Sequence, residues 1–98
     1  EEVDEGDEIA KALGDKKVAI LQNHGILTTG PSVDIALWFY MSMERCCQAQ
    51  LMAESAGKPI SVPHETAIKT REFIANDIAA WASYQPAFDK IIKCSLIY

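Results

Sequence analysis

The chain has 98 residues, 49% of them apolar and 23% charged, which is the balance of one small globular domain. Its formal net charge is −5, so it lacks the basic surface that nucleic acids require, and we expect no nucleic-acid partner. We also expect no membrane segment, because the longest wholly apolar run, residues 35–41, is far too short to span a bilayer. The acidic start lacks the apolar core of a signal peptide, and the odd number of cysteines favours a reducing, cytoplasmic location.

The first half of the chain predicts a short helix and two strands. We expect the acidic residues 1–5 to be frayed and a helix to cover residues 7–13. Residues 18–22 predict a strand, and the consecutive apolar positions 18–21 are typical of a strand covered on both faces. Residues 26–29 predict a second, shorter strand, since three of the four are β-branched.

A long helix is predicted next. Ser32 is a suitable N-cap, and the helix is expected to continue to about Ala56, where Gly57 ends it. Residues 35–41 are apolar on every side of this helix, which indicates burial by more than one neighbour. The consecutive aromatic residues 38–40 are therefore interpreted as core or subunit-interface residues rather than as a binding stripe.

A second long helix is predicted over residues 63–83, because Pro63 is favourable at a helix start and the apolar residues that follow have helical spacing. Pro86 is expected to break this helix. Residues 87–93 then form at most a last turn or two, and the apolar tail 94–98 has no expected element.

These elements leave the strands without enough neighbours. A two-stranded ribbon is marginal in water, and the helix that is apolar all round needs more protein than this sequence supplies. The chain also does not begin with methionine. We therefore interpret it as a piece of a larger α/β domain, in preference to a protomer that partner chains complete.

His24 is the candidate for chemistry. It follows the first strand, where α/β proteins commonly bind ligands, and imidazole is the commonest metal ligand. Asn23 tolerates unusual backbone angles, Gly25 allows a turn or a close approach, and Gly30 ends the second strand. The pattern alone leaves an alternative, which is a structural histidine bonded to a backbone carbonyl at a tight corner.

The remaining candidates have structural interpretations. His64 stands at a predicted helix start and is expected to have a surface or capping role. Cys46, Cys47 and Cys94 match no zinc-site spacing, and neighbouring helical cysteines diverge too far to pair, so we interpret all three as packing residues. We find no paired acid and base, serine elbow or phosphate loop, and we therefore assign no catalytic residue.

The chain resembles the class II aldolase/adducin family in one continuous pattern. The pattern comprises residues 19–30 (AILQNHGILTTG), then Ser32-Val33-Asp34, and a long helix that ends in residues 47–51 (CQAQL). The likeness covers roughly residues 6–93, and the strand–Asn–His–Gly–strand–Gly–helix run is its most specific part. Residues 1–98 are accordingly interpreted as the carboxy-terminal part of such a domain.

The resemblance implies an αβα sandwich around a largely antiparallel sheet, usually assembled as a tetramer with sites between subunits. In catalytic members, zinc or another divalent metal is held by a His-any-His pair and by the histidine that matches His24. The metal is a Lewis acid for the bound carbonyl and hydroxyl oxygens, and an upstream Glu is the acid/base. This chain has neither the pair nor that acid, so only His24 is carried over and the ligand set is incomplete.

The function that the resemblance implies is that of a fragment of a zinc-dependent aldolase-type lyase. The complete protein would cleave or form a C–C bond in a small, sugar-like hydroxy-carbonyl substrate through a metal-stabilised enediolate, and this chain alone would be inactive. The alternative is a non-catalytic adducin-like module for self-association or cytoskeleton binding, although the presence of His24 favours the enzyme. A degraded reading frame without a stable product is a third possibility.

Overall fold

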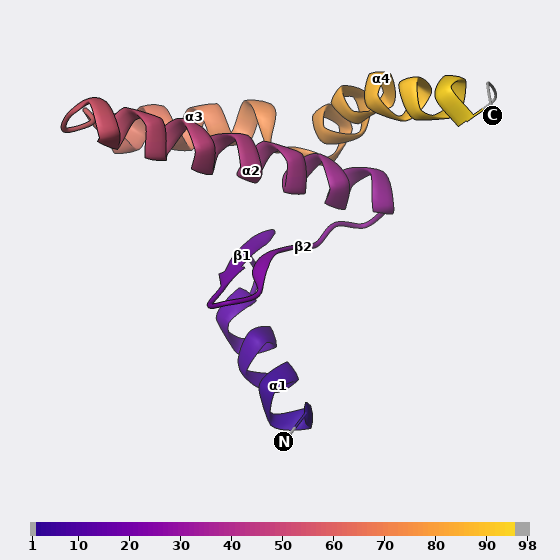
Figure 1. Cartoon of the computed structure of the whole chain (residues 1–98), viewed down its shortest axis with the longest axis horizontal. Helices are drawn as coiled ribbons and strands as arrows, with labels where there is room; N and C mark the ends of the chain where they lie inside the picture. The colour runs from indigo at the N-terminus through magenta and orange to yellow at the C-terminus, as the bar shows by residue number, and fades with distance from the viewer. Residues whose placement is uncertain (1, 96–98) are drawn as a thin grey trace.

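The computed structural model describes residues 2–95, with side chains described from residue 4 onward. The elements in chain order are α1 (Glu2–Leu13), β1 (Val18–Leu21), β2 (Gly25–Thr28), α2 (Val33–Ala56), α3 (His64–Ile74) and α4 (Asp77–Ser95). The α/β class, a short strand pair with long helices, is therefore confirmed. Figure 1 shows α2 running across the molecule, with the hairpin and α1 on one side of it and α4 on the other.

The two strands form an antiparallel hairpin. Its register pairs Val18 with Thr28 and Leu21 with Gly25. Gln22 therefore belongs to the turn, although the sequence predicts it in the first strand. Ile20 on β1 is 64% exposed. The expected cover on both faces of this strand is thus absent among residues 2–95, because no element of that range packs over the second face.

The helix α2 begins and ends where the sequence predicts. The Ser32 side chain accepts a hydrogen bond from the backbone N–H of Ile35 at 3.4 Å, and the backbone N–H of Gly57 bonds to the carbonyl of Ala53 at 3.1 Å. Ile35 and Phe39, four residues apart, are buried, whereas Tyr40 is exposed. The helix α2 thus packs against more than one neighbour, the hairpin and α4, as expected. Its other faces are not covered within residues 2–95, in line with the expected need for more protein.

The predicted helix over residues 63–83 is wrong, because the structure divides it into α3 and α4. Asn76 causes the division: its Oδ1 accepts a hydrogen bond from the backbone N–H of Ala79 at 2.9 Å, and its Nδ2 donates to the carbonyl of Phe73 at 2.8 Å. The first of these bonds is that of an N-cap, which satisfies a free donor at the start of α4.

The expected break at Pro86 is also wrong, since α4 continues through it to Ser95. A proline removes one backbone hydrogen bond, and tertiary packing can offset that cost. Ala80 and Tyr84, just before the proline, are buried, and the rings of Tyr84 and Phe88 lie 6.4 Å apart across it. The predicted tail is in part helical, and residues 96–98 lie outside the described range.

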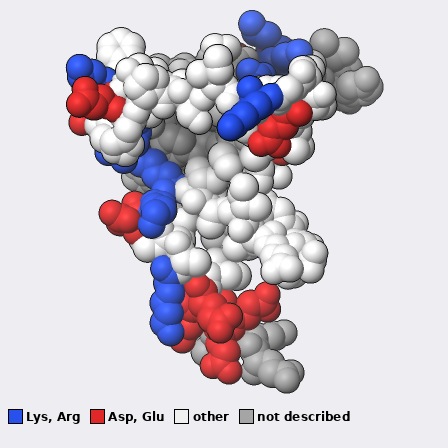
Figure 2. Space-filling model, turned by 90° about the vertical axis from the view of Figure 1, so that its left-hand side faces the viewer, with Lys and Arg blue, Asp and Glu red and all other residues white. Residues whose placement is uncertain are grey.

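The helix α1 begins five residues before the predicted start at Asp7, so the described residues 2–5 are helical rather than frayed. Acidic side chains near a helix N-terminus interact favourably with the helix dipole, and this sequence places several there. Figure 2 shows acidic side chains gathered at this end of the molecule.

The three cysteines are free thiols. Cys47 is half-buried, but Cys46 and Cys94 are exposed, so the packing role expected for these two is wrong. Both lie on helices, α2 and α4, whose outer faces nothing among residues 2–95 covers. None of the helices over residues 2–95 combines the length and the apolar character that crossing a bilayer requires.

The core is small and lies where α2 meets α4 and the hairpin. Ile35, Phe39 and Ala80 form its buried cluster, and Ala80 has no exposed surface. Val18 and Ala75 pack against this cluster as partly buried residues. The core therefore joins β1, α2 and α4, together with the link between α3 and α4.

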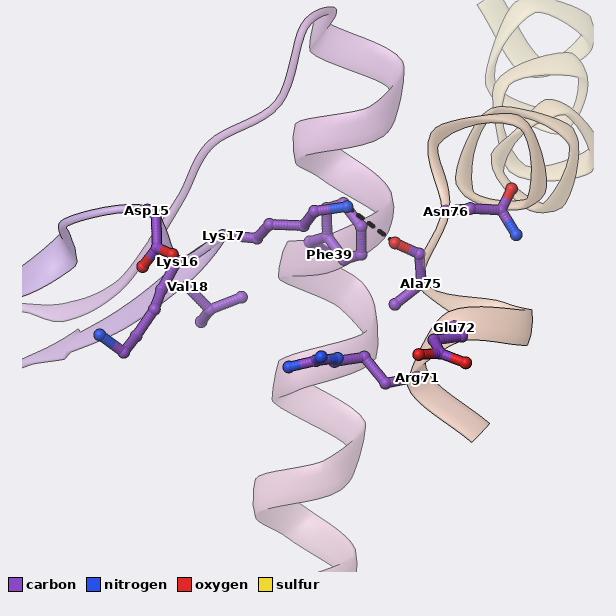
Figure 3. Close-up of a pocket in the computed structure, with 9 residues that line it drawn as sticks. All are labelled: Asp15, Lys16, Lys17, Val18, Phe39, Arg71, Glu72, Ala75 and Asn76. Atoms are coloured by element: carbon purple, nitrogen blue, oxygen red, sulfur yellow. Dashed lines mark hydrogen bonds between the residues drawn. The ribbon is translucent and has the colours of Figure 1, made fainter. Parts of the chain in front are cut away.

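Lys17, in the loop before β1, connects the hairpin to the corner between α3 and α4. Its Nζ donates a hydrogen bond to the carbonyl of Ala75 at 2.7 Å (Figure 3). The same atom lies 3.5 Å from Oδ1 of Asp77. The same ammonium group lies 4.7 Å from the centre of the Phe39 ring, within cation–π range. One cation of the loop before β1 thus contacts both the α3–α4 corner and α2.

Gly30 permits the close passage of the chain from β2 into α2. A Cβ atom at this position would lie 2.9 Å from Cγ2 of Ile35 and 3.0 Å from the backbone nitrogen of Ala36. Nearby, Oγ1 of Thr28 donates a hydrogen bond to the carbonyl of Ala36 at 2.8 Å. The end of the hairpin is therefore held directly against the first turn of α2.

Replacing Lys17 by Met should lower the free energy of unfolding by about 1 kcal/mol, because a charge-assisted hydrogen bond is lost from a half-exposed position. The measurement is urea denaturation followed by circular dichroism. Lys16→Met is the matched control, since Lys16 forms no ion pair or side-chain hydrogen bond within the described residues. Equal midpoints for the two variants would contradict the role of Lys17.

Replacing Gly30 by Ala should destabilise the protein by about 1–3 kcal/mol, since the new methyl group would overlap Ile35 and the backbone of Ala36. The control is Gly6→Ala on α1, where a Cβ has no atom within 4 Å. That change should stabilise the helix by up to about 1 kcal/mol. A thermal melt of both variants tests the pair, and a stable Gly30→Ala protein would refute the close passage.

Candidate functional site

His24 stands in the turn of the hairpin, between β1 and β2. Its backbone N–H bonds to the carbonyl of Leu21 at 3.2 Å, which closes the turn. The neighbours on both sides have positive φ, 61° at Asn23 and 134° at Gly25. Asn and Gly are the residues that adopt such angles most readily, so the local sequence is suited to presenting His24 at this corner.

The imidazole of His24 projects away from the core. Its side chain is 67% exposed, and its Nε2 atom lies 3.6 Å from Oε1 of Glu5 on α1. Within residues 2–95 its ring makes no hydrogen bond to a backbone carbonyl. The bond that the structural alternative required is thus absent from the described residues.

The described residues do not form a complete metal site. No group of three or more His, Cys, Asp or Glu side chains within them lies close enough together to hold a metal ion. Among the acidic side chains described, Glu5 alone lies within ion-pair distance of His24, and His64 begins α3, in a different part of the chain. A catalytic zinc site usually has three protein ligands, so His24 can supply at most a part of one.

Sequence reasoning missed two further features. The contact between Glu5 and His24 joins residues 19 positions apart, and no local pattern indicates it. A cleft of about 800 Å³ also opens at the other end of β1, between the loop before this strand, α2 and α3. Lys16, Lys17 and Arg71 contribute to its lining (Figure 3). The only sequence signal for the cleft is the adjacent pair Lys16-Lys17.

Comparison with known proteins places this geometry in a family. The sequence model of the family described as "Class II Aldolase and Adducin N-terminal domain" matches residues 1–51, slightly more than half of the chain. That match includes α1, the hairpin with His24 and most of α2.

Individual proteins agree with the family match. The chain is 41% identical over 83 residues to "Decarboxylase NovR" of Streptomyces niveus, covering 85% of this chain and 31% of that protein. It is 40% identical over 95 residues to "Meiotically up-regulated gene 14 protein" of Schizosaccharomyces pombe, covering 94% of this chain and 37% of that protein. The chain thus spans about a third of the length of these curated relatives.

A solved structure shows the same arrangement of elements. The L-fuculose 1-phosphate aldolase from Glaciozyma antarctica PI12 superposes with a TM-score of 0.83 at 38% identity, over 87% of this chain and 34% of that protein. The sequence match through the hairpin and this structural match agree. The chain therefore belongs to the class II aldolase and adducin family.

Proposed function

We propose that this chain contributes His24 as one metal ligand in an aldolase-type lyase. The metal is proposed to be zinc or another divalent ion. The supporting observation is the exposed imidazole on a turn whose backbone angles suit Asn23 and Gly25. The described residues supply only this imidazole and a neighbouring carboxylate, so the remaining ligands and the acid/base are proposed to lie outside these 98 residues.

The reaction class follows from the named chemistry of two similar proteins. One is an aldolase and the other a decarboxylase, and both names describe the breaking of a C–C bond. We infer that the whole protein cleaves or forms a C–C bond in a small hydroxy-carbonyl compound. In that reaction, this chain presents one imidazole at the corner of the hairpin, beside the carboxylate of Glu5.

We also propose that this chain is the carboxy-terminal part of the domain and that the whole protein is a homo-oligomer. Exposed apolar side chains of the loop before α3, of α3 and of α4 support the proposal that further protein surrounds this chain. Ile60 is 97% exposed and Phe73 81% exposed, and Ile78 and Trp81 are also exposed. Apolar residues that are this exposed are normally covered by further protein, either from the same chain or from another subunit.

Metal content tests the proposed role of His24. The whole protein, purified without chelators, should contain about one zinc or other divalent ion per subunit by elemental mass spectrometry. His24→Ala should weaken zinc affinity about tenfold or more and so lower the metal content, because even loss of an outer-shell partner weakens metal binding about 10–100-fold. His64→Ala, which changes the chain's other histidine, should retain the metal.

Two results would contradict this proposal. The first is whole protein that binds no divalent metal after incubation with zinc. The second is a His24→Ala protein that keeps its full metal content. A metal-free protein that still self-associates would favour the adducin-like alternative.

A further inference from the structure

We propose that the cleft at the start of β1 binds a small organic anion, with a carboxylate or phosphate head and an apolar body. Figure 3 shows Lys17, from the loop before β1, and Arg71, from α3, extending toward each other's element, while Lys16 lines the edge of the cleft with its ammonium group turned outward. Val18 and Phe39 supply apolar lining between them. This combination of convergent cations with an apolar wall is that of a small-molecule site rather than of a solvated surface.

The cations retain hydrogen-bond donors for a ligand. Lys16 and Arg71 form no ion pair or side-chain hydrogen bond with any residue of the described range. Lys17 is held by the carbonyl of Ala75 and by Asp77, and an ammonium group has a third N–H donor. Lys17 is thus a fixed charge, while Arg71 presents a planar group that suits bidentate contact with a carboxylate or a phosphate.

The charge of the cleft differs from that of the chain. Its lining has three cations and two carboxylates, Asp15 and Glu72, and Asp77 pairs with one of the cations, Lys17, so the charges around the cleft balance, whereas the whole chain has a net charge of −5. The acidic side chains gather instead around α1 (Figure 2). A small anion is therefore repelled less at the cleft than at the α1 end.

The size of the cleft also suits a small molecule. Its volume of about 800 Å³ lies within the range of ligand pockets, about 300–1,000 Å³. The cleft is adjacent to the first residue of β1, whereas His24 follows the last. The anion site is therefore independent of the proposed metal site, and either proposal can fail without the other.

The test is a calorimetric titration of the whole protein at low ionic strength with phenyl phosphate and, separately, with benzoate. Benzyl alcohol is the neutral control. Saturable binding of either anion, without binding of the alcohol, is the expected result, and the two titrations distinguish a phosphate ligand from a carboxylate ligand. Added salt should weaken the binding, because the charges are partly exposed.

Variants locate the site. Arg71→Gln and Lys16→Gln should each weaken binding about five- to tenfold, since each removes a charge-assisted hydrogen bond. Lys69→Gln makes the same change of charge on α3 but lies outside the cleft lining, so it should bind like the wild type. His24→Ala should also leave anion binding unchanged.

Absence of saturable binding, equal binding of benzyl alcohol, or wild-type affinity in both Arg71→Gln and Lys16→Gln would overturn the proposal. Circular dichroism melts of each variant identify any loss of fold. If Arg71→Gln does not fold, Lys16→Gln still tests the proposal. Lys16 makes no side-chain hydrogen bond within the described residues, so its replacement should not affect folding.

Discussion

The packing of Ile35 and Phe39 on α2 against Ala80 on α4 is the contact on which the rest of the molecule depends. Ala80 is small enough to be fully enclosed, so the two helices can meet closely at this point. The hairpin contacts the same face of α2 through Val18, and Thr28 is bonded to the first part of that helix. A two-stranded ribbon is marginal alone, and here α2 provides the surface that stabilises it.

This arrangement gives the two ends of the hairpin different chemical character. The turn end presents one imidazole next to the acidic α1, and the other end presents cations around Val18 and Phe39. Antiparallel pairing fixes the separation of the two ends, since each strand has a set length per residue. Contacts that position the hairpin on α2, including Lys17 and Gly30, therefore position both ends at once.

Local patterns predicted the parts of the fold that local forces determine. The hairpin, the Ser32 cap and the corner at Asn23 and Gly25 each depend on residues that are close in sequence. The division between α3 and α4 has a local cause as well, the Asn76 cap. The apolar residues from Ala67 to Trp81 keep helical spacing across this division. Apolar periodicity therefore predicts one continuous helix and gives no sign of the cap at Asn76.

The wrong prediction at Pro86 and the contacts that the sequence did not indicate have non-local causes. Pro86 was expected to end a helix, yet α4 continues through it, and the burial of Tyr84 and Ala80 just before it depends on the distant α2. The approach of Glu5 to His24, and of Arg71 to the loop before β1, joins segments that only the tertiary fold brings together. No single-sequence pattern contains that information.

The two proposed sites depend on the surrounding protein in different ways. A catalytic metal site needs several ligands, and the described residues give His24 only one carboxylate neighbour. The anion cleft is formed by residues of this chain alone, and the hydrogen bond from Lys17 to Ala75 fixes one of its walls relative to another. The cleft should consequently retain its form wherever α2, α3 and the hairpin keep their packing, whereas the imidazole acquires its function only when further ligands reach the turn.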